Sequence, residues 1–214
     1  MATAAQLKQI TRPLLELDPR FVLLKRWLII RPVGHWLYGY HLDRRTEKGV
    51  FVVRVFIKPL YTKDWRESAW EVYPPPSAGE TGTWSATTPN VDRHLIEVMA
   101  GDASNALTRV DSPDMFLALL LSDWHPHTGD MAIHTFALAG RRREAIHVAE
   151  SWLRYYRNPP DRRPRFEKIR RLQRLIAVFK AGQARTNRLL RTFEWINARK
   201  HGVEQWWSWT PIAT

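Results

Sequence analysis

The sequence predicts an α+β fold in which a small antiparallel β-meander of about three strands packs with a mostly helical second half. Three segments before residue 60 are rich in β-branched and aromatic residues, and the apolar residues after residue 90 recur with a helical period. The length of 214 residues is typical of one domain. We therefore predict a single domain, residues 1–214, with a strand-rich half at 1–90 and a helical half at 91–214.

The first half is expected to begin with an amphipathic helix, because Leu7, Ile10 and Leu14 recur at three- and four-residue steps. Pro13 predicts an interruption of that helix, since proline cannot donate the helical hydrogen bond. Residues 60–90 are rich in proline and glycine and are expected to form a long irregular loop. The expected strands are residues 21–31, 36–43 and 50–58.

The second half is expected to consist of helices. Ser112-Pro113-Asp114 is a strong helix start, and the apolar run that follows predicts the most buried helix of the protein. Residues 137–146, with Gly140 and Ala145, resemble the turn between the two helices of a tetratricopeptide unit, which implies a local helical hairpin and no particular function. The expected helices are residues 91–99, 115–124, 131–139, 143–157, 165–180 and 187–199.

The composition excludes several classes of function. The chain contains no cysteine, so disulfides, thiolate metal ligands and cysteine nucleophiles are ruled out. The N-terminal segment does not have the pattern of a signal peptide, and the longest apolar run, 115–121, is far shorter than the roughly 20 residues of a membrane span. We therefore expect a cytoplasmic protein. Fingerprints of common hydrolases, nucleotide-binding proteins and zinc proteases are absent.

Nearly all of the net charge of +12 is concentrated in one segment. Residues 162–200 hold 13 lysines and arginines against two glutamates. On a helix at 165–180, arginines are expected opposite an apolar face made of Phe166, Ile169, Leu172, Leu175, Ile176 and Phe179. Guanidinium groups suit carboxylates and phosphates, so we predict a site for an anionic partner; the alternative is an ordinary solvated helix face. The predicted binding residues are Arg163, Arg170, Arg171, Arg174, Arg185 and Arg188.

A second candidate site is a cluster of histidines and aspartates. Imidazole and carboxylate groups at short spacing suit a divalent transition metal, which would make the protein a metal-dependent enzyme. The spacing does not match the motifs of known metallohydrolases, and ordinary surface histidines are the alternative interpretation. The candidate ligands are Asp123, His125, His127, Asp130 and His134.

The third feature is the high tryptophan content, with a cluster near the C-terminal end of the sequence. Trp206, Trp207 and Trp209 are expected either to fold back on the domain or to form an interaction tail that joins copies of the chain into a homo-oligomer. Taken together, these features favour a non-enzymatic binding protein without a cofactor. Its partner would be an acidic protein surface or a nucleic acid, contacted through the arginine-rich C-terminal helices.

Overall fold

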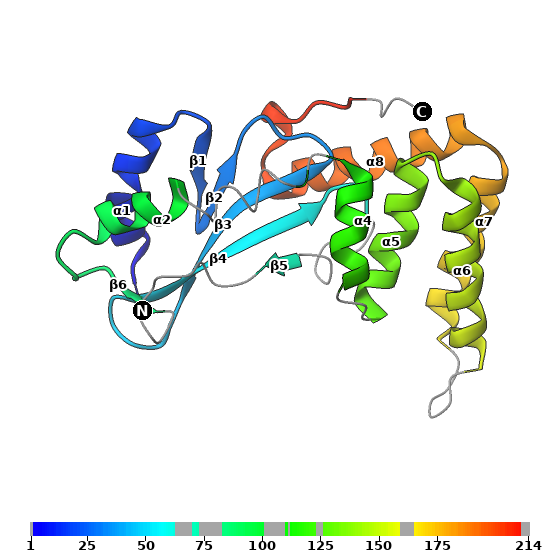
Figure 1. Cartoon of the computed structure of the whole chain (residues 1–214), viewed down its shortest axis with the longest axis horizontal. Helices are drawn as coiled ribbons and strands as arrows, with labels where there is room; N and C mark the ends of the chain where they lie inside the picture. The colour runs from blue at the N-terminus through cyan, green and yellow to red at the C-terminus, as the bar shows by residue number, and fades with distance from the viewer. Residues whose placement is uncertain are drawn as a thin grey trace. The chain divides into compact units, whose positions relative to one another are not determined.

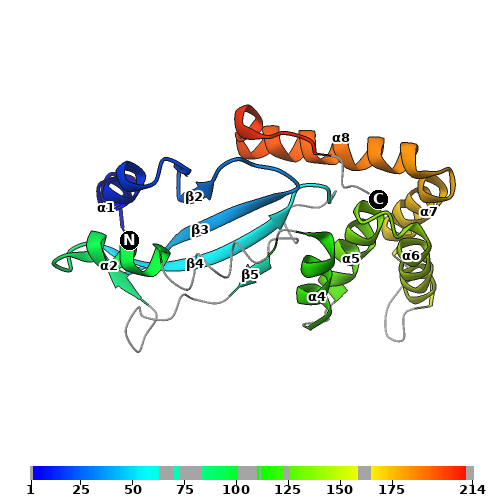
Figure 2. The same ribbon diagram turned by 45° about the horizontal axis from the view of Figure 1, so that its top comes forward.

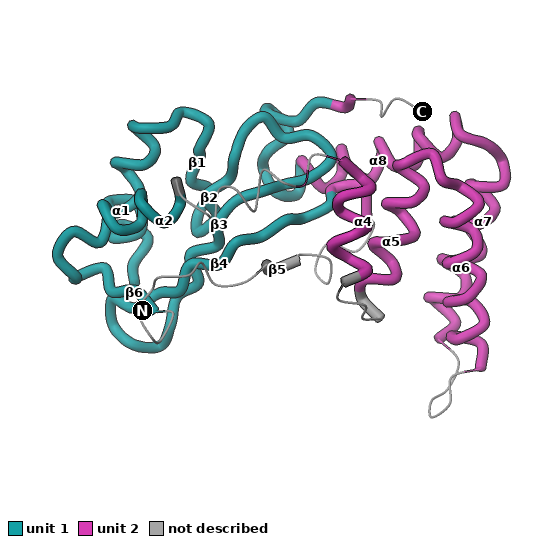
Figure 3. Tube along the Cα trace, in the orientation of Figure 1, with its two compact units in different colours: residues 1–59, 69–109, 199–208 teal, residues 60–68, 110–198, 209–214 magenta. Residues whose placement is uncertain are grey.

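The computed structural model describes residues 2–62, 70–72, 83–100, 110, 112–122, 126–158 and 165–210, and these form an α+β fold as predicted. The chain divides into two compact units (Figure 3). The sheet unit comprises residues 1–59, 69–109 and 199–208, and the helical unit comprises residues 60–68, 110–198 and 209–214. The division therefore does not fall at residue 90, because residues 91–109 and 199–208 group with the sheet. The single domain expected from the length stays a prediction.

The sheet unit is built on an antiparallel sheet (Figure 1). The strand order is β1-β2-β3-β4-β5, and β6 also pairs with β4, so the expected number of about three strands is too low. The segment 21–31, expected as one strand, reverses at Lys25, whose φ of 58° lies in the left-handed region. Lysine gives no turn signal, which is why the sequence did not reveal this hairpin. The strands are β1 (Phe21–Leu24), β2 (Trp27–Ile30), β3 (Trp36–Arg44), β4 (Val50–Pro59), β5 (Trp70–Val72) and β6 (Trp84–Ser85).

The long strand β4 is buried along most of its length. Phe51 and Val53 belong to the predicted apolar face, but Val52 and Phe56 from the opposite face are buried as well. Lys58 was expected on a polar face and is only 5% exposed. Its burial, with a smaller contribution from the charge of Lys200, lowers the pKa of the Lys58 amine to about 8.

The sheet unit contains two helices, one before the first strand in the chain and one after the last strand. Helix α1 (Ala4–Leu17) starts with a capping box between Thr3 and Gln6. It continues through Pro13 to its end, so the expected interruption is wrong. Helix α2 (Val91–Ala100) buries Val91, Leu95 and Met99, as its period predicts. The hydroxyl group of Tyr40 on β3 donates a hydrogen bond of 3.0 Å to the carbonyl of Met99 and so ties α2 to the sheet.

The helical unit contains α4 (Pro113–Ser122), α5 (Pro126–Leu138), α6 (Arg142–Arg157), α7 (Phe166–Lys180) and most of α8 (Gln183–His201). Helices α4, α5, α6 and α7 lie side by side in chain order, as Figures 1 and 2 both show. The predicted hairpin between α5 and α6 is present, with Gly140 in the left-handed region at φ 76°. Gly129 lets α5 approach α6 closely, because a Cβ atom at this position would overlap the indole ring of Trp152.

Helix α4 begins where the sequence predicts. The amide of Met115 donates a hydrogen bond to the Ser112 hydroxyl, which caps the helix. The helix is not buried all round, however, since Met115 and Leu121 are exposed and only Phe116, Leu117 and Leu120 among its long apolar side chains are buried. The prediction that this would be the most buried helix, made from its continuous apolar sequence, is therefore wrong, because the helix packs mainly against α5. None of the helices in the described part of the chain is both long enough and apolar enough to cross a membrane.

Candidate anion-binding groove

A groove of about 470 Å³ lies between α7 and α8 of the helical unit. The two helices are separated only by Ala181 and Gly182, and Gly182 adopts a φ of 115°, a conformation that residues with a side chain rarely take. This sharp corner places one flank of α7 next to one flank of α8. The groove is lined by Glu167, Arg170, Arg171, Arg174, Leu175 and Val178 of α7 and by Leu189 and Phe193 of α8.

The predicted apolar face of α7 supports this arrangement. Leu172, Leu175, Ile176 and Phe179 are buried as expected. Phe166, expected on the same face, is the first residue of the helix and is 67% exposed. The face thus begins one turn later than the sequence indicates, and its edge at Leu175 becomes part of the groove.

The arginines of α7 are in different environments. Arg170 and Arg174 are exposed, and no carboxylate in the part of the chain that the structure describes forms an ion pair with either. Arg171 is only 13% exposed, and its Nη1 atom lies 3.4 Å from Oδ2 of Asp130 on α5. Arg171 was predicted to face a partner together with its neighbours, but it is already paired inside the protein. Arg163 lies outside the described residues.

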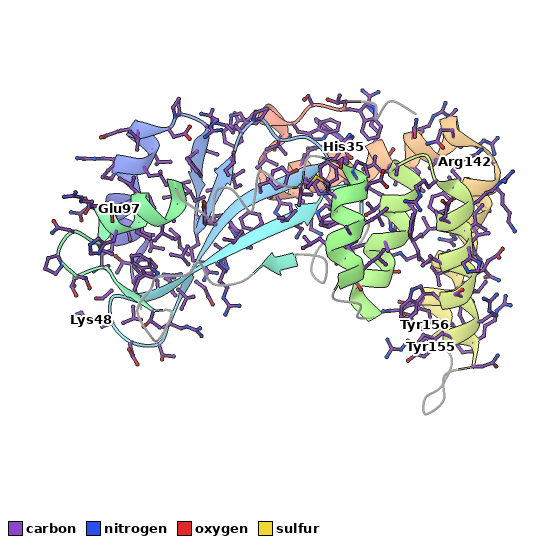
Figure 4. All side chains as sticks on the ribbon, in the orientation of Figure 1. His35, Lys48, Glu97, Arg142, Tyr155 and Tyr156 are labelled. Carbon is purple, nitrogen blue, oxygen red and sulfur yellow. The ribbon has the colours of Figure 1, made fainter. Side chains whose placement is uncertain are left out.

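Other basic groups of α7 stabilise the packing of α7 on α6. Lys168 Nζ lies 5.3 Å from the centre of the Tyr156 ring, and Arg165 lies over the same ring. Lys180 forms an ion pair of 3.1 Å with Glu150. Figure 4 labels Tyr156 near one end of α6 and Arg142 at the other. Arg142 donates a hydrogen bond of 3.1 Å to the carbonyl of Phe179, so the two helices are linked at both ends. These basic groups belong to the fold and not to the groove.

Helix α8 adds a second set of exposed arginines. Arg185 and Arg188, both predicted binding residues, are exposed, and so is Arg191. Within the residues whose placement the structure gives, none of these three forms an ion pair with a carboxylate. At 1.5 Å per residue they extend over about 9 Å of the helix. Arg170 and Arg174 on α7 and these three residues on α8 thus make a set of five exposed arginines without a described carboxylate partner; Arg143 and Arg157 of α6 are further exposed arginines of this kind.

The candidate metal ligands can be followed only in part. Asp123, His125 and the side chain of His127 lie outside the described residues. Asp130 pairs with Arg171, and its backbone carbonyl lies 2.7 Å from Nδ1 of the buried His134. His134 also packs edge-on against Phe193 of the groove at 5.9 Å. In the described ranges no group of three or more potential ligands could hold a metal ion.

The two predicted metal ligands that can be placed therefore support the groove from behind. Asp130 fixes the guanidinium of Arg171, and His134 contacts the ring of Phe193. The sequence gives no sign of this role, because the two contacts join α5 to α7 and to α8 across long stretches of chain.

Trp206 and Trp207 are engaged within the sheet unit, whereas Trp209 is grouped with the helical unit. The amide of Val33 donates to the Trp206 carbonyl, and the amide of Ser208 donates to the Val33 carbonyl, so this segment pairs in parallel with residue 33. Arg31 lies over the Trp206 ring at 5.5 Å. Trp206, Trp207 and Trp209 are each half-buried. The segment at Trp206 and Trp207 thus packs on residue 33 of the same chain, while the folded-back tail and the homo-oligomer both stay predictions.

Sequence reasoning missed the apolar half of the groove. Leu189 and Phe193 stand one helical turn apart on α8, a signal that was available, and Gly182 marked the break between the helices. The sequence does not show, however, that this flank of α8 faces α7. Comparison of the chain with protein-family models, curated proteins and solved structures gave no match.

Proposed function

We propose that the protein is a binding protein that holds an acidic partner on the exposed arginines of α7 and α8. The observation that carries this proposal is the group of five exposed arginines, at 170, 174, 185, 188 and 191, that form no ion pair with a described carboxylate. Charges of one sign at this density repel one another, which disfavours the folded state unless an anion is present.

The contrast with neighbouring basic residues supports the proposal. Lys180, Arg171 and Arg141 of the same unit each have a carboxylate partner within the protein, at 3.1, 3.4 and 3.0 Å. The five exposed arginines have no such partner among the described carboxylates. Guanidinium groups donate paired hydrogen bonds to carboxylates and phosphates, so they suit an acidic protein or a nucleic acid alike.

The proposal is tested by binding of two fluorescent anionic probes, a peptide of 15 glutamates and a 15-nucleotide oligo-dT, measured by fluorescence anisotropy. At least one probe should bind, with an affinity that falls steeply as salt rises from about 50 to about 300 mM, because counterions compete for the arginines. The quadruple variant Arg170→Ala/Arg174→Ala/Arg185→Ala/Arg188→Ala should bind at least about tenfold more weakly.

The control is a variant with the same loss of charge at exposed positions of the sheet unit: Lys8→Ala/Arg12→Ala/Arg45→Ala/Lys48→Ala. It should bind like the wild-type protein. Equal weakening in the two variants would show a general effect of net charge and would contradict the proposal. Failure of both probes to bind the wild-type protein would do the same.

A further inference from the structure

We infer that the groove between α7 and α8 receives an apolar side chain of an acidic peptide, while the carboxylates of that peptide bind the arginines on the rim. This inference rests on the proposed function and names the class of partner. It is drawn from the groove lining, which combines cationic groups and apolar surface, and from the extent of the exposed arginines on α8.

The apolar part of the groove is suited to an aliphatic or aromatic side chain. Leu175 and Val178 come from α7, and Leu189 and Phe193 come from α8. The groove has a volume of about 470 Å³, which is within the range of small-ligand pockets and larger than any one side chain requires. An amphipathic peptide that lays two apolar residues along the groove would remove the half-buried side chains of Val178, Leu189 and Phe193 from water, and such burial is the main source of affinity in helix-in-groove recognition.

The rim of the groove determines the charge of the occupant. Arg170 and Arg174 stand one helical turn apart on α7 and are exposed. Arg171 is held by Asp130, so it is fixed in place beside them. Glu167 is the one carboxylate among the lining residues, so the lining keeps a net positive charge. An occupant with carboxylates on each side of its apolar residues would complement this rim.

The arginines outside the groove favour a peptide over a small organic anion. Arg185 precedes Leu189 by one turn of α8 and so lies on the groove side, whereas Arg188 and Arg191 are turned about 100° and about 160° away from Leu189 around the helix. Trp195 and Ile196, 44% and 53% exposed, follow on the same helix. A small ligand in the groove would not reach Arg185, whereas an extended or helical peptide that follows α8 would contact both the groove and Arg185, and Arg188 at the edge of the same surface.

The lining also favours a peptide over a nucleic acid. Proteins that bind single strands stack bases on several aromatic side chains, and here Phe193 is the one aromatic residue among three aliphatic ones. Glu167 on the rim would repel a continuous row of phosphates. Carboxylates spaced by apolar residues avoid this repulsion, because the peptide can leave a gap opposite Glu167.

The test compares two fluorescein-labelled 14-residue peptides. Both carry alternating blocks of aspartate and glutamate; the first has leucine at positions 4, 8 and 11, and the second has serine there. We expect the leucine peptide to bind at least tenfold more tightly than the serine peptide. In the variant Leu189→Gln this advantage should fall to less than threefold, while the affinity for the serine peptide stays unchanged.

Val178→Gln is a second variant at a half-buried position on the opposite wall, and it should act in the same direction. Circular dichroism identifies either variant that does not fold, and glutamine is a good helix former at both positions. The matched control is Thr192→Gln, an exposed residue of α8 that does not line the groove, which should leave the advantage of the leucine peptide intact.

The outcomes separate this inference from the proposed function. Equal affinities for the two peptides, with binding that still depends on the arginines, would overturn the inference and leave the proposed function standing. Tight binding of oligo-dT with no binding of either peptide would likewise overturn it in favour of a nucleic acid. A leucine advantage that survives both Leu189→Gln and Val178→Gln would place the apolar contact elsewhere. Absence of binding by every probe would overturn both proposals.

Discussion

The sheet unit pairs or buries several of its basic residues and leaves others, such as Lys8, Arg45 and Lys48, exposed, whereas the α7–α8 pair concentrates exposed arginines on two consecutive helices. In the sheet unit, Arg20 pairs with Asp18 at 2.7 Å, and Arg54 pairs with Asp43 at 3.5 Å. Lys58 is taken into the interior altogether. On α7 and α8, exposed arginines follow one another along the helices without described carboxylate partners. The difference shows that net charge alone does not identify a binding surface; what matters is which charges the fold has already neutralised or buried.

The two units also differ in the kind of atom that lies next to a closely packed glycine. Gly39 of β3 stands between β2 and β4, paired with Ile29 and Phe56, and a Cβ atom there would overlap the backbone carbonyl oxygen of Leu28. Gly129 of α5 faces a side chain, the indole ring of Trp152. Backbone inside a sheet cannot move without breaking strand pairing, whereas a half-buried ring can shift. The sheet unit should therefore tolerate such changes less well than the helical unit.

The largest expected effect is that of Gly39→Ala. The added methyl group must displace strand β2 from β3, and the φ of 154° is also one that alanine rarely adopts. We expect the free energy of unfolding to fall by at least about 3 kcal/mol, measured by urea denaturation followed by circular dichroism. A loss below about 1 kcal/mol would contradict the close approach of the two strands. Gly34→Ala is the control, because no atom lies within 4 Å of a Cβ at that glycine.

The second largest effect is a dependence of the free energy of unfolding on pH, and it originates in the sheet unit. Burial, with the charges of Lys58 and Lys200, lowers the pKa of His201 to about 4, below its ordinary 6.5. The unfolded chain therefore takes up a proton on His201 between pH 6.5 and 4 when the folded chain does not, so the stability present above pH 6.5 is lost as the pH falls through this range. For Lys58 the same argument applies between pH 10.5 and about 8, where stability rises with pH.

Each of these two groups should change the free energy of unfolding by about 2 kcal/mol across its pH range, after allowance for partial exposure to water. Urea midpoints measured from pH 4.5 to 10 give the slopes. His201→Gln should flatten the acidic slope, and Lys58→Met should flatten the alkaline one. A profile that the two substitutions leave unchanged would show that other groups cause it. The alanine variants at Arg170 and Arg174 serve as controls and should leave both slopes as they are.

The smallest of the three effects is that of Gly129→Ala. Alanine is the better helix former by about 1 kcal/mol, but its methyl group must displace the Trp152 indole from α5. We expect a net loss of about 1 kcal/mol in unfolding free energy, measured as for Gly39→Ala. The double variant Gly129→Ala/Trp152→Leu tests the cause, since the alanine should be neutral or stabilising once the ring is gone. A loss of the same size in both backgrounds would exclude the ring as the cause.

Much of the local structure follows from the sequence. Ser112-Pro113-Asp114 gave the start of α4, Gly140 the hairpin, and the periods at 91–99 and 166–180 the helices α2 and α7. These features depend on short-range hydrogen bonds and side-chain direction, which neighbouring residues determine. Interactions between distant residues were not accessible. The reversal at Lys25 and the passage of α1 through Pro13 contradict local preference and are maintained by packing.

For the candidate site, the position of the positive charge and the apolar face of α7 can be read from the amino-acid sequence. Which arginines remain available depends on the packing of the helices, because Asp130 is 41 residues from Arg171 in the chain and pairs with it through the packing of α5 on its neighbours. The same packing decides that Leu189 and Phe193 face α7 and form a groove. The charge and the apolar period of a helix depend on one segment of the chain. The neutralisation of an arginine and the formation of a groove each require two segments in contact, and only folding brings those segments together.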